Sequence, residues 1–321
     1  MTETAIEAAP ALVQRLPGEP EAVFIVGASR SGTSLMRTLL ELSGRMAIAR
    51  ENHFIGHLRE SEGARFYFRR AGDLTNDETL SRITEMIYGG EFERSSRWRE
   101  VSTFWHWLVS NVPRDDMERR LLAAERTERG LFVAFLRAYA DSKERPIIGE
   151  KTPPHLAYVD TLLEWFPDGR VVHMLRDPRA VYVSDLRRRR NKLRKPYSWF
   201  AKLPGLLPLV ILVQTALVWR GAVKRHFDYQ RRFPERYQLV RFEDLVREPR
   251  QTLSGLYHFL GVAMPDDPMN VKVVSQGFRG GEQGLDAAAA NRWREHISGL
   301  SRRLLELLLR GPMRRVGYAR G

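Results

Sequence analysis

Cysteine is absent from the 321 residues of this chain, which excludes disulfide bonds and thiolate metal sites. Residues 1–20 are acidic and rich in Ala and Pro. They lack the basic start and apolar core of a secretory signal peptide. We therefore expect a protein that stays in the cytoplasm. The chain also lacks internal repeats.

Acidic residues are fewer than basic residues in this chain. There are 39 Asp and Glu residues against 52 Lys and Arg residues, which gives a net charge of +13. Such a surplus is either a solvated basic surface or an attraction for a polyanionic cofactor, an acidic acceptor, a membrane surface or a nucleic acid. A hydrophobic content of 43% is enough for a substantial core. We predict a loose tail over residues 1–20 and a single domain over residues 21–321.

A loop that lacks an expected lysine is the most informative motif. The apolar run Val23 to Val26 breaks at Gly27, crosses a small polar loop, and enters a helix at Thr33. Backbone N–H groups and the helix dipole at such a turn attract anions, and the glycine spacing nearly matches the P-loop G-x-x-x-x-G-K-[ST]. Thr33 replaces the lysine, and the cation Arg30 lies inside the loop. The motif therefore points away from hydrolysis of ATP or GTP.

Short apolar runs alternate with helical patterns along the rest of the chain. We expect strands over residues 22–26, 46–49, 146–149, 170–175 and 236–242. Residues 56–140 read as a helical insertion, with breaks at 89–90 and near Gly130. The alternation predicts an α/β, P-loop-like three-layer fold with a central parallel β-sheet flanked by helices. Ligands bind beyond the carboxyl ends of such strands, where the first loop, Glu51, Lys151 and Arg176 fall.

A second candidate anchor follows the strand over residues 170–175. Asp177 before Pro178 fits a helix N-cap with proline at the first helical position. A magnesium ligand of the Walker-B type is the alternative interpretation of Asp177. Arg176 at the strand end and Ser184 two turns into the helix could both reach a phosphate.

Together these motifs resemble the sulfotransferases that use 3′-phosphoadenosine-5′-phosphosulfate (PAPS), over residues 23 to about 294. In that superfamily the first loop holds the 5′-phosphosulfate, and the strand-end arginine and a serine eight residues later hold the 3′-phosphate. The resemblance implies PAPS as the donor substrate, used without a metal. It also implies a set of nucleotide-binding residues: Arg30, Ser31, Gly32, Thr33, Ser34, Arg176, Ser184, Phe242, Arg279, Gly280 and Gly281.

Two segments resemble the family but depart from its pattern. The segment from Val240 to Leu245 is similar to the family's Y-E-D-L segment, with Phe242 where a nucleotide-contacting tyrosine is usual. The segment from Arg279 to Gly284 is similar to the R-K-G-x-x-G loop that closes over the nucleotide. The usual tryptophan after that loop comes only later, at Trp293.

The spacing is most similar to that of the tyrosylprotein sulfotransferases and related bacterial enzymes with R-S-G-T-[ST]-L loops. In the tyrosylprotein branch, a glutamate 21 residues after the loop arginine is the general base, which implies that role for Glu51. Lys151 resembles the family lysine that stabilises the bridging oxygen, and with Arg30 it would neutralise the transferred and leaving groups. Pro153 stands where the cytosolic small-molecule enzymes place a catalytic histidine.

The segment over residues 187–219 is not explained by this resemblance. Arg187 to Lys195 carries seven cations in nine residues, and no charge occurs between Lys202 and Arg220. One interpretation is a core helix preceded by a solvated basic loop. The other is a hairpin that contacts a lipid acceptor, or a membrane through peripheral attachment at its inner surface. The apolar run falls short of the ~18–20 residues of a spanning helix.

We predict a sulfotransferase that acts on a hydroxyl or amine acceptor, with sugar, lipid, peptide and small metabolite all open. The alternatives are a P-loop nucleotide kinase and a non-catalytic basic nucleotide- or nucleic-acid-binding protein. Glu51 and Lys151 favour catalysis, and no nucleic-acid-binding module is recognisable, so we expect no nucleic-acid partner. His53 and His155 are the alternative bases, whereas His173 lies in an apolar strand and is expected to be a core residue.

Overall fold

Five short apolar segments form the parallel sheet at the centre of the computed structural model. The structure describes residues 14–56, 63–91, 103–193, 206–270, 272–274, 280–283 and 285–318. The strands are β1 (Ala22–Gly27), β2 (Met46–Ala49), β3 (Ile147–Lys151), β4 (Arg170–Leu175) and β5 (Tyr237–Arg241). Their order in the sheet is β2-β3-β1-β4-β5, and every pair is parallel. The expected α/β fold is confirmed.

The strand register brings the polar motifs to one edge of the sheet. Ala49 at the end of β2 lies beside Glu150 of β3, and Leu175 at the end of β4 lies beside Arg241 of β5. Because the carboxyl ends of parallel strands meet at one edge, the residues that follow them come together there.

Alternating residues of β1 supply two hydrophobic cores. Val23 and Ile25 belong to one cluster, whereas Phe24 and Val26 belong to the other. This period of two is that of a strand buried on both faces. The first cluster is covered by α1 (Thr33–Glu41), α11 (Phe242–Arg247) and α12 (Pro249–Leu260). The second includes residues of α7 (Glu128–Asp141) and α8 (Val159–Trp165).

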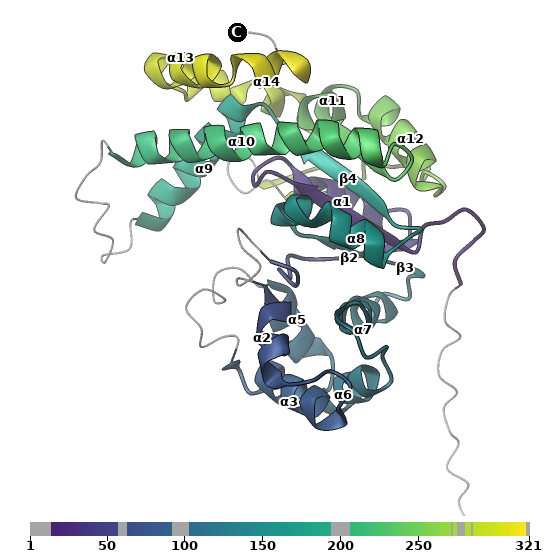
Figure 1. The fold of residues 1–321 in the computed structure, drawn as a ribbon. Helices are drawn as coiled ribbons and strands as arrows, with labels where there is room; N and C mark the ends of the chain where they lie inside the picture. The colour runs from purple at the N-terminus through teal and green to yellow at the C-terminus, as the bar shows by residue number, and fades with distance from the viewer. Residues whose placement is uncertain are drawn as a thin grey trace, which may run out of the picture.

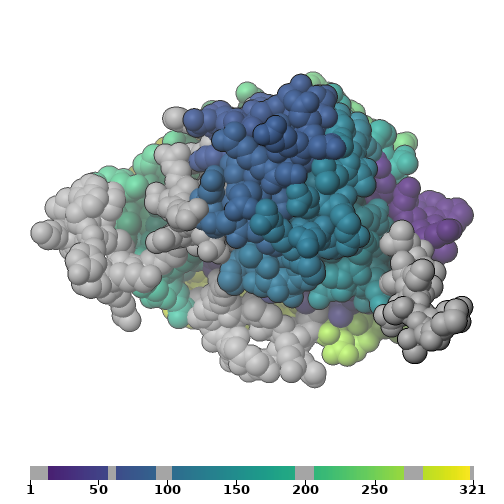
Figure 2. Space-filling model, turned by 90° about the horizontal axis from the view of Figure 1, so that it is seen from below, coloured from purple at the N-terminus to yellow at the C-terminus, as the bar shows by residue number. Residues whose placement is uncertain are grey.

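The helical insertion forms a layer of its own below the sheet in Figure 1, and Figure 2 shows that it occupies much of the lower face. Its other described helices are α2 (Ala64–Ala71), α3 (Asp77–Tyr88), α5 (Thr103–Asn111) and α6 (Arg114–Leu122). The break expected near Gly130 is wrong in position. The chain leaves the helix at Ala123, and α7 begins after Thr127, whose side chain accepts a hydrogen bond from the Gly130 N–H at 3.0 Å.

A third core lies on the other side of the molecule, around α9 (Pro178–Leu193) and α10 (Leu206–Arg232). The two helices pack side by side, and α13 (Gly299–Leu308) and α14 (Arg310–Arg315) contact α10. The basic run is therefore helical as far as Leu193, not a loop; residues 194–205 lie outside the described residues. Within the described chain, α10 is the one helix long and apolar enough to cross a membrane, with 44% of its most apolar window buried.

The described part of the N-terminal segment is attached to the domain. The buried Glu19 carboxylate accepts hydrogen bonds from the Arg45 guanidinium at 2.7 Å and from the Leu16 N–H. At the other end of the chain, β6 (Lys272–Val274) and β7 (Gly280–Gln283) form an antiparallel pair. Gly280 and Gly281 lie in β7, whereas Arg279 falls outside the described residues.

Candidate active site

The loop after β1 is built by positive backbone angles. Arg30 has a φ of 73° and Gly32 a φ of 89°, both in the left-handed region that glycine tolerates best. A Cβ on Gly32 would lie 2.5 Å from the Phe242 ring, so glycine is also required by packing. Successive N–H groups in such a conformation form a concave anion site.

Within the described residues, no side chain caps the first backbone N–H groups of α1. Gly32 caps the helix without a side-chain hydrogen bond, and the first turn carries no acidic residue. The Ser31 hydroxyl is fully buried and has no hydrogen-bond partner among the described residues. A buried hydroxyl of this kind, beside the positive end of a helix, fits a bound phosphate or sulfate.

Two arginines converge on this loop from different strands. The Arg30 Nε donates to Ser184 Oγ at 3.0 Å, and Arg176 Nη1 donates to the Arg30 carbonyl at 3.3 Å. Within the described chain neither guanidinium forms a salt bridge, and the buried Arg176 Nε has no partner. Burial lowers the pKa of both groups, and each is lowered further by a neighbouring arginine, Arg188 for Arg30 and Arg30 for Arg176. An anion between them would relieve this cost.

Arg176 is held from several sides. Its guanidinium lies 4.1 Å from the centre of the Phe242 ring, and its Nη2 donates to the Ala289 carbonyl at 3.1 Å. Trp219 Nε1 donates to the Arg176 carbonyl at 2.8 Å. Phe242 therefore packs against both the loop glycine and the arginine, although it offers no hydroxyl.

The residue after Arg176 acts as a helix cap. Asp177 Oδ1 accepts the Arg179 N–H at 2.8 Å, and its Oδ2 binds the Arg179 guanidinium at 2.7 Å. The Asp177 N–H in turn donates to Glu243, whose other oxygen accepts the Tyr318 hydroxyl at 2.7 Å. These bonds account for the Asp177 carboxylate without a metal ion. Among the residues described, no group of three or more His, Asp or Glu side chains has the arrangement of a metal site.

Glu51 and Lys151 meet at the ends of β2 and β3. Lys151 Nζ lies 2.5 Å from Glu51 Oε1, and His53 Nε2 lies 3.7 Å from Glu51 Oε2. Burial raises the pKa of Glu51, but the neighbouring His53 imidazole and the Lys151 charge outweigh it and lower that pKa to about 2. The carboxylate is therefore ionised and neutralised by the lysine in this state.

The two histidines near Glu51 are far less accessible. The His53 side chain is 2% exposed and that of His155 is 0% exposed, against 36% for Glu51. His155 Nδ1 bonds the buried Glu150 carboxylate, whose other oxygen accepts the Thr152 hydroxyl at 2.6 Å. Glu51 is thus the most exposed of the three side chains.

The structure gathers most of the predicted nucleotide residues but also reveals others. Glu243 and Trp219 bond the two polar ends of the peptide group that joins Arg176 to Asp177, and neither residue was expected from the sequence to have a role. The one sequence signal for Glu243 is its place in the E-D-L segment. His173 is a core residue as expected, and its Nδ1 bonds the Tyr237 hydroxyl at 2.5 Å. Trp293 is buried under the Arg179 guanidinium, 4.2 Å from the ring centre, in the third core.

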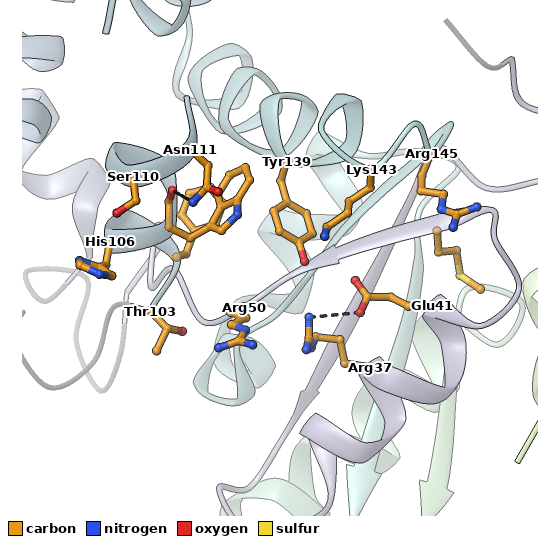
Figure 3. A pocket seen from close by; sticks show the side chains of 13 residues that line it. Arg37, Glu41, Arg50, Thr103, His106, Ser110, Asn111, Tyr139, Lys143 and Arg145 are labelled. Atoms are coloured by element: carbon orange, nitrogen blue, oxygen red, sulfur yellow. Dashed lines mark hydrogen bonds and ion pairs between the residues drawn. The ribbon is translucent and has the colours of Figure 1, made fainter. Parts of the chain in front are cut away.

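A separate cavity of about 800 Å³ opens beside β2 between α1, α5 and α7 (Figure 3). Tyr139 of α7 and Lys143, two residues after that helix, face Arg37 and Glu41 of α1 across it, with Arg50 to one side. Glu41 pairs with Arg37 at 3.2 Å, so the lining keeps a surplus of positive charge. None of the residues of the loop after β1 lines this cavity.

The loop at the sheet edge is P-loop-like, carries an arginine and lacks the NTPase lysine, which fits a protein that binds a phosphorylated nucleotide by charge. The model of the sulfotransferase family matches residues 20–266, and the chain belongs to that family. Its members are enzymes that use PAPS.

Curated relatives match over a limited stretch. An omega-hydroxy-beta-dihydromenaquinone-9 sulfotransferase of Mycobacterium bovis is 30% identical over 122 residues, 37% of this chain and 30% of that protein. Carbohydrate sulfotransferase 1 of Rattus norvegicus is 26% identical over 140 residues, 40% of this chain and 34% of the relative. The matched segment is thus about a third of each relative's length. The particular closeness to tyrosylprotein sulfotransferases stays a prediction.

Solved structures support the fold along nearly the whole chain. The sulfotransferase domain of the curacin biosynthetic pathway matches with a TM-score of 0.55 and 19% identity, over 96% of this chain and 100% of that one. The sulfotransferase domain of the Synechococcus PCC 7002 olefin synthase matches with a TM-score of 0.52 and 21% identity, over 96% and 99% of the two chains.

Proposed function

We propose that this chain moves the sulfuryl group of PAPS to a hydroxyl or amine acceptor. The observation that carries the proposal is the convergence of Arg30, Arg176 and Ser184 on one anion loop, with two half-buried guanidiniums that have no carboxylate partner in the described chain. The 5′-phosphosulfate would occupy the N–H groups of the loop and the start of α1, with the Thr33 and Ser34 hydroxyls beside it. Arg176 and Ser184 would hold the 3′-phosphate.

The transfer step needs one base and several fixed cations. Glu51 takes the proton from the acceptor, the acceptor oxygen or nitrogen bonds to sulfur, and the bond from sulfur to the 5′-phosphate oxygen breaks. Arg30 and Lys151 neutralise the charge on the transferred group and on the departing 3′-phosphoadenosine-5′-phosphate. A positioned base contributes roughly 10²–10⁴-fold to such a reaction.

The Glu51–Lys151 ion pair suggests an order for donor binding and for the reaction of the acceptor. Lys151 cannot neutralise the phosphosulfate while it is fully engaged by Glu51 at 2.5 Å. The Lys151 cation lowers the pKa of Glu51. When the donor attracts the lysine away, the pKa of Glu51 rises and the carboxylate becomes a stronger base. Donor binding therefore prepares the base, and we expect the donor to bind before the acceptor reacts.

Calorimetry tests the nucleotide assignment. We expect 3′-phosphoadenosine-5′-phosphate to bind at least about tenfold tighter than adenosine 5′-phosphate, because a charge-assisted hydrogen bond contributes roughly 1.5–3 kcal/mol. Arg176→Gln should abolish this preference. Arg236→Gln is the matched control, because Arg236 also stacks on a phenylalanine, Phe233, and also donates to backbone carbonyls, but at the opposite end of the strands.

Equal affinity for the two nucleotides would contradict the proposal. Magnesium-dependent ATP binding tighter than either would favour the kinase alternative. The acceptor is open, and the names of the relatives suggest two pools to screen by mass spectrometry with labelled donor: hydroxylated menaquinones and carbohydrates.

A further inference from the structure

The outer face of α10 is unusually apolar for a surface that nothing in the described chain covers. Its exposed large hydrophobic residues are between 40% and 67% accessible: Leu206, Leu209, Val210, Val213, Leu217 and Val218. Spacings of three, four and seven residues place most of them on one stripe of the helix. The opposite stripe, with Ile211 and Trp219, is buried in the third core.

The charge around this stripe has a single sign. Between Leu186 and Phe227 the sequence contains eleven Lys and Arg residues and no Asp or Glu. The exposed cations of the described part lie on both helices: Arg187, Arg188 and Arg190 on α9, and Arg220, Lys224 and Arg225 on α10. We call this combined surface of α9 and α10 the basic–apolar face.

The two helices present this face as a fixed unit. Arg189 of α9 bonds Asp185 at 3.0 Å and reaches across to the Gln214 side chain of α10 at 2.7 Å. Figure 1 shows the C-terminal end of α9 and the N-terminal end of α10 on the same side of the molecule. Because α10 also supplies Trp219 and Ile211 to the core, it cannot leave the protein to span a bilayer without exposing that core.

We propose that the basic–apolar face docks on an anionic lipid bilayer, with the apolar stripe entering the interface and the flanking cations meeting the headgroups. An amphipathic helix with basic flanks binds membranes in this way. A second copy of the chain fits the face less well, because it would bring two surfaces of the same charge together. The inference does not depend on the proposed enzymatic reaction.

Docking would bring the donor site close to the lipid surface. Ser184, which contacts the loop arginine, precedes Arg188 by four residues on α9. That spacing is about 6 Å along a helix axis. An acceptor held in the headgroup region would therefore lie near the phosphosulfate, without leaving the membrane.

Vesicle co-sedimentation tests the docking face. We expect the full chain to pellet with phosphatidylcholine vesicles containing phosphatidylserine, and not with phosphatidylcholine alone. Each Lys or Arg near the surface should add about fivefold to partitioning at low salt. Binding should weaken in high salt, because electrostatic attraction is screened over about 10 Å at 0.1 M and 3 Å at 1 M.

The decisive variant is L209Q/V213Q/L217Q, which changes exposed positions only and uses a good helix former. We expect it to lose at least tenfold in vesicle binding with an unchanged circular dichroism spectrum. L16Q/V109Q is the matched control, since it removes exposed apolar side chains elsewhere and should bind as the parent does.

Three outcomes would overturn the inference: no lipid-dependent pelleting at low salt, equal binding to neutral vesicles, or full binding by the triple variant. A parent chain that runs as a dimer in size-exclusion chromatography, and becomes monomeric in the triple variant, would assign the face to self-association instead.

Discussion

At the scale of single residues, the Glu51–Lys151 contact concentrates the chemistry of the site. A carboxylate 36% exposed, beside a lysine 7% exposed, is accessible on the side where an acceptor would arrive. The chemistry of both residues follows from the resemblance, but their direct pairing does not. The pairing arises because β2 and β3 are neighbours in the sheet, and the sequence of neither segment predicts this.

Glu51→Gln should preserve nucleotide binding and lower kcat by about 10²-fold or more, because the amide keeps the shape of the side chain but cannot take a proton. The assay needs any working acceptor and saturating PAPS. Glu41→Gln is the control, since it changes a half-buried carboxylate that pairs with Arg37 outside the donor site. Near-normal turnover in Glu51→Gln would transfer the role to His53 or His155.

Gly32→Ala should weaken binding of 3′-phosphoadenosine-5′-phosphate by tenfold or more. The new Cβ meets the Phe242 ring at 2.5 Å, and a φ of 89° is costly for alanine. Gly299→Ala should leave binding unchanged, because nothing lies within 4 Å of its Cβ position and no positive φ is required. Calorimetry compares the two variants, and unaltered affinity in Gly32→Ala would exclude the loop from the nucleotide site.

At the scale of elements, local sequence signals decide which predictions succeed. The bounds of β2 and β4 were predicted because their apolar runs end at charged or small polar residues. The start of α7 differs from the expectation because its cap, Thr127, is a weaker signal than Gly130 three residues later, which suggests a break. The bonds of Arg176 to Ala289 and Trp219 join residues 113 and 43 positions apart, so they depend on tertiary packing that no local pattern encodes.

Asp177→Ala should destabilise the start of α9 by about 3 kcal/mol or more. It removes a helix cap, worth about 1 kcal/mol, and leaves the buried Arg179 without its nearest carboxylate. Asp177→Asn should lose less, because the amide oxygen can still cap. Urea unfolding measures both. Magnesium should stabilise none of the three proteins, and a magnesium effect confined to the parent would restore the metal-ligand interpretation.

At the scale of the whole molecule, two buried histidines make the free energy of unfolding depend on pH. Burial lowers the pKa of His173 to about 3 and that of His226 to about 4, and both bond the Tyr237 hydroxyl. In the unfolded chain each titrates near 6.5. Between pH 6.5 and about 4 the unfolded state therefore binds more protons, so stability falls as the pH falls through this window.

We expect these histidines to cost about 2 kcal/mol each at pH 5 relative to pH 7.5. Urea unfolding at the two pH values measures the loss. His226→Gln should remove part of the pH dependence, whereas His258→Gln, at an exposed position, should not. The pKa of about 2 at Glu51 acts only below its ordinary value of 4.5, so it does not contribute in this window. Equal stability at pH 5 and pH 7.5 would contradict the assignment.

The ion pair between Glu19 and Arg45 affects where a protease can cleave the chain. Arg45 also donates to the Gln14 carbonyl at 2.9 Å, so one side chain ties the residues before β1 to the turn before β2. A protease that removed everything before Glu21 would therefore do more than trim a tail. It would leave the half-buried Arg45 guanidinium without its carboxylate, next to the start of β2. Residues 14–20 should accordingly resist digestion in the folded protein, and a shortened product starting at Glu21 should unfold at a lower temperature.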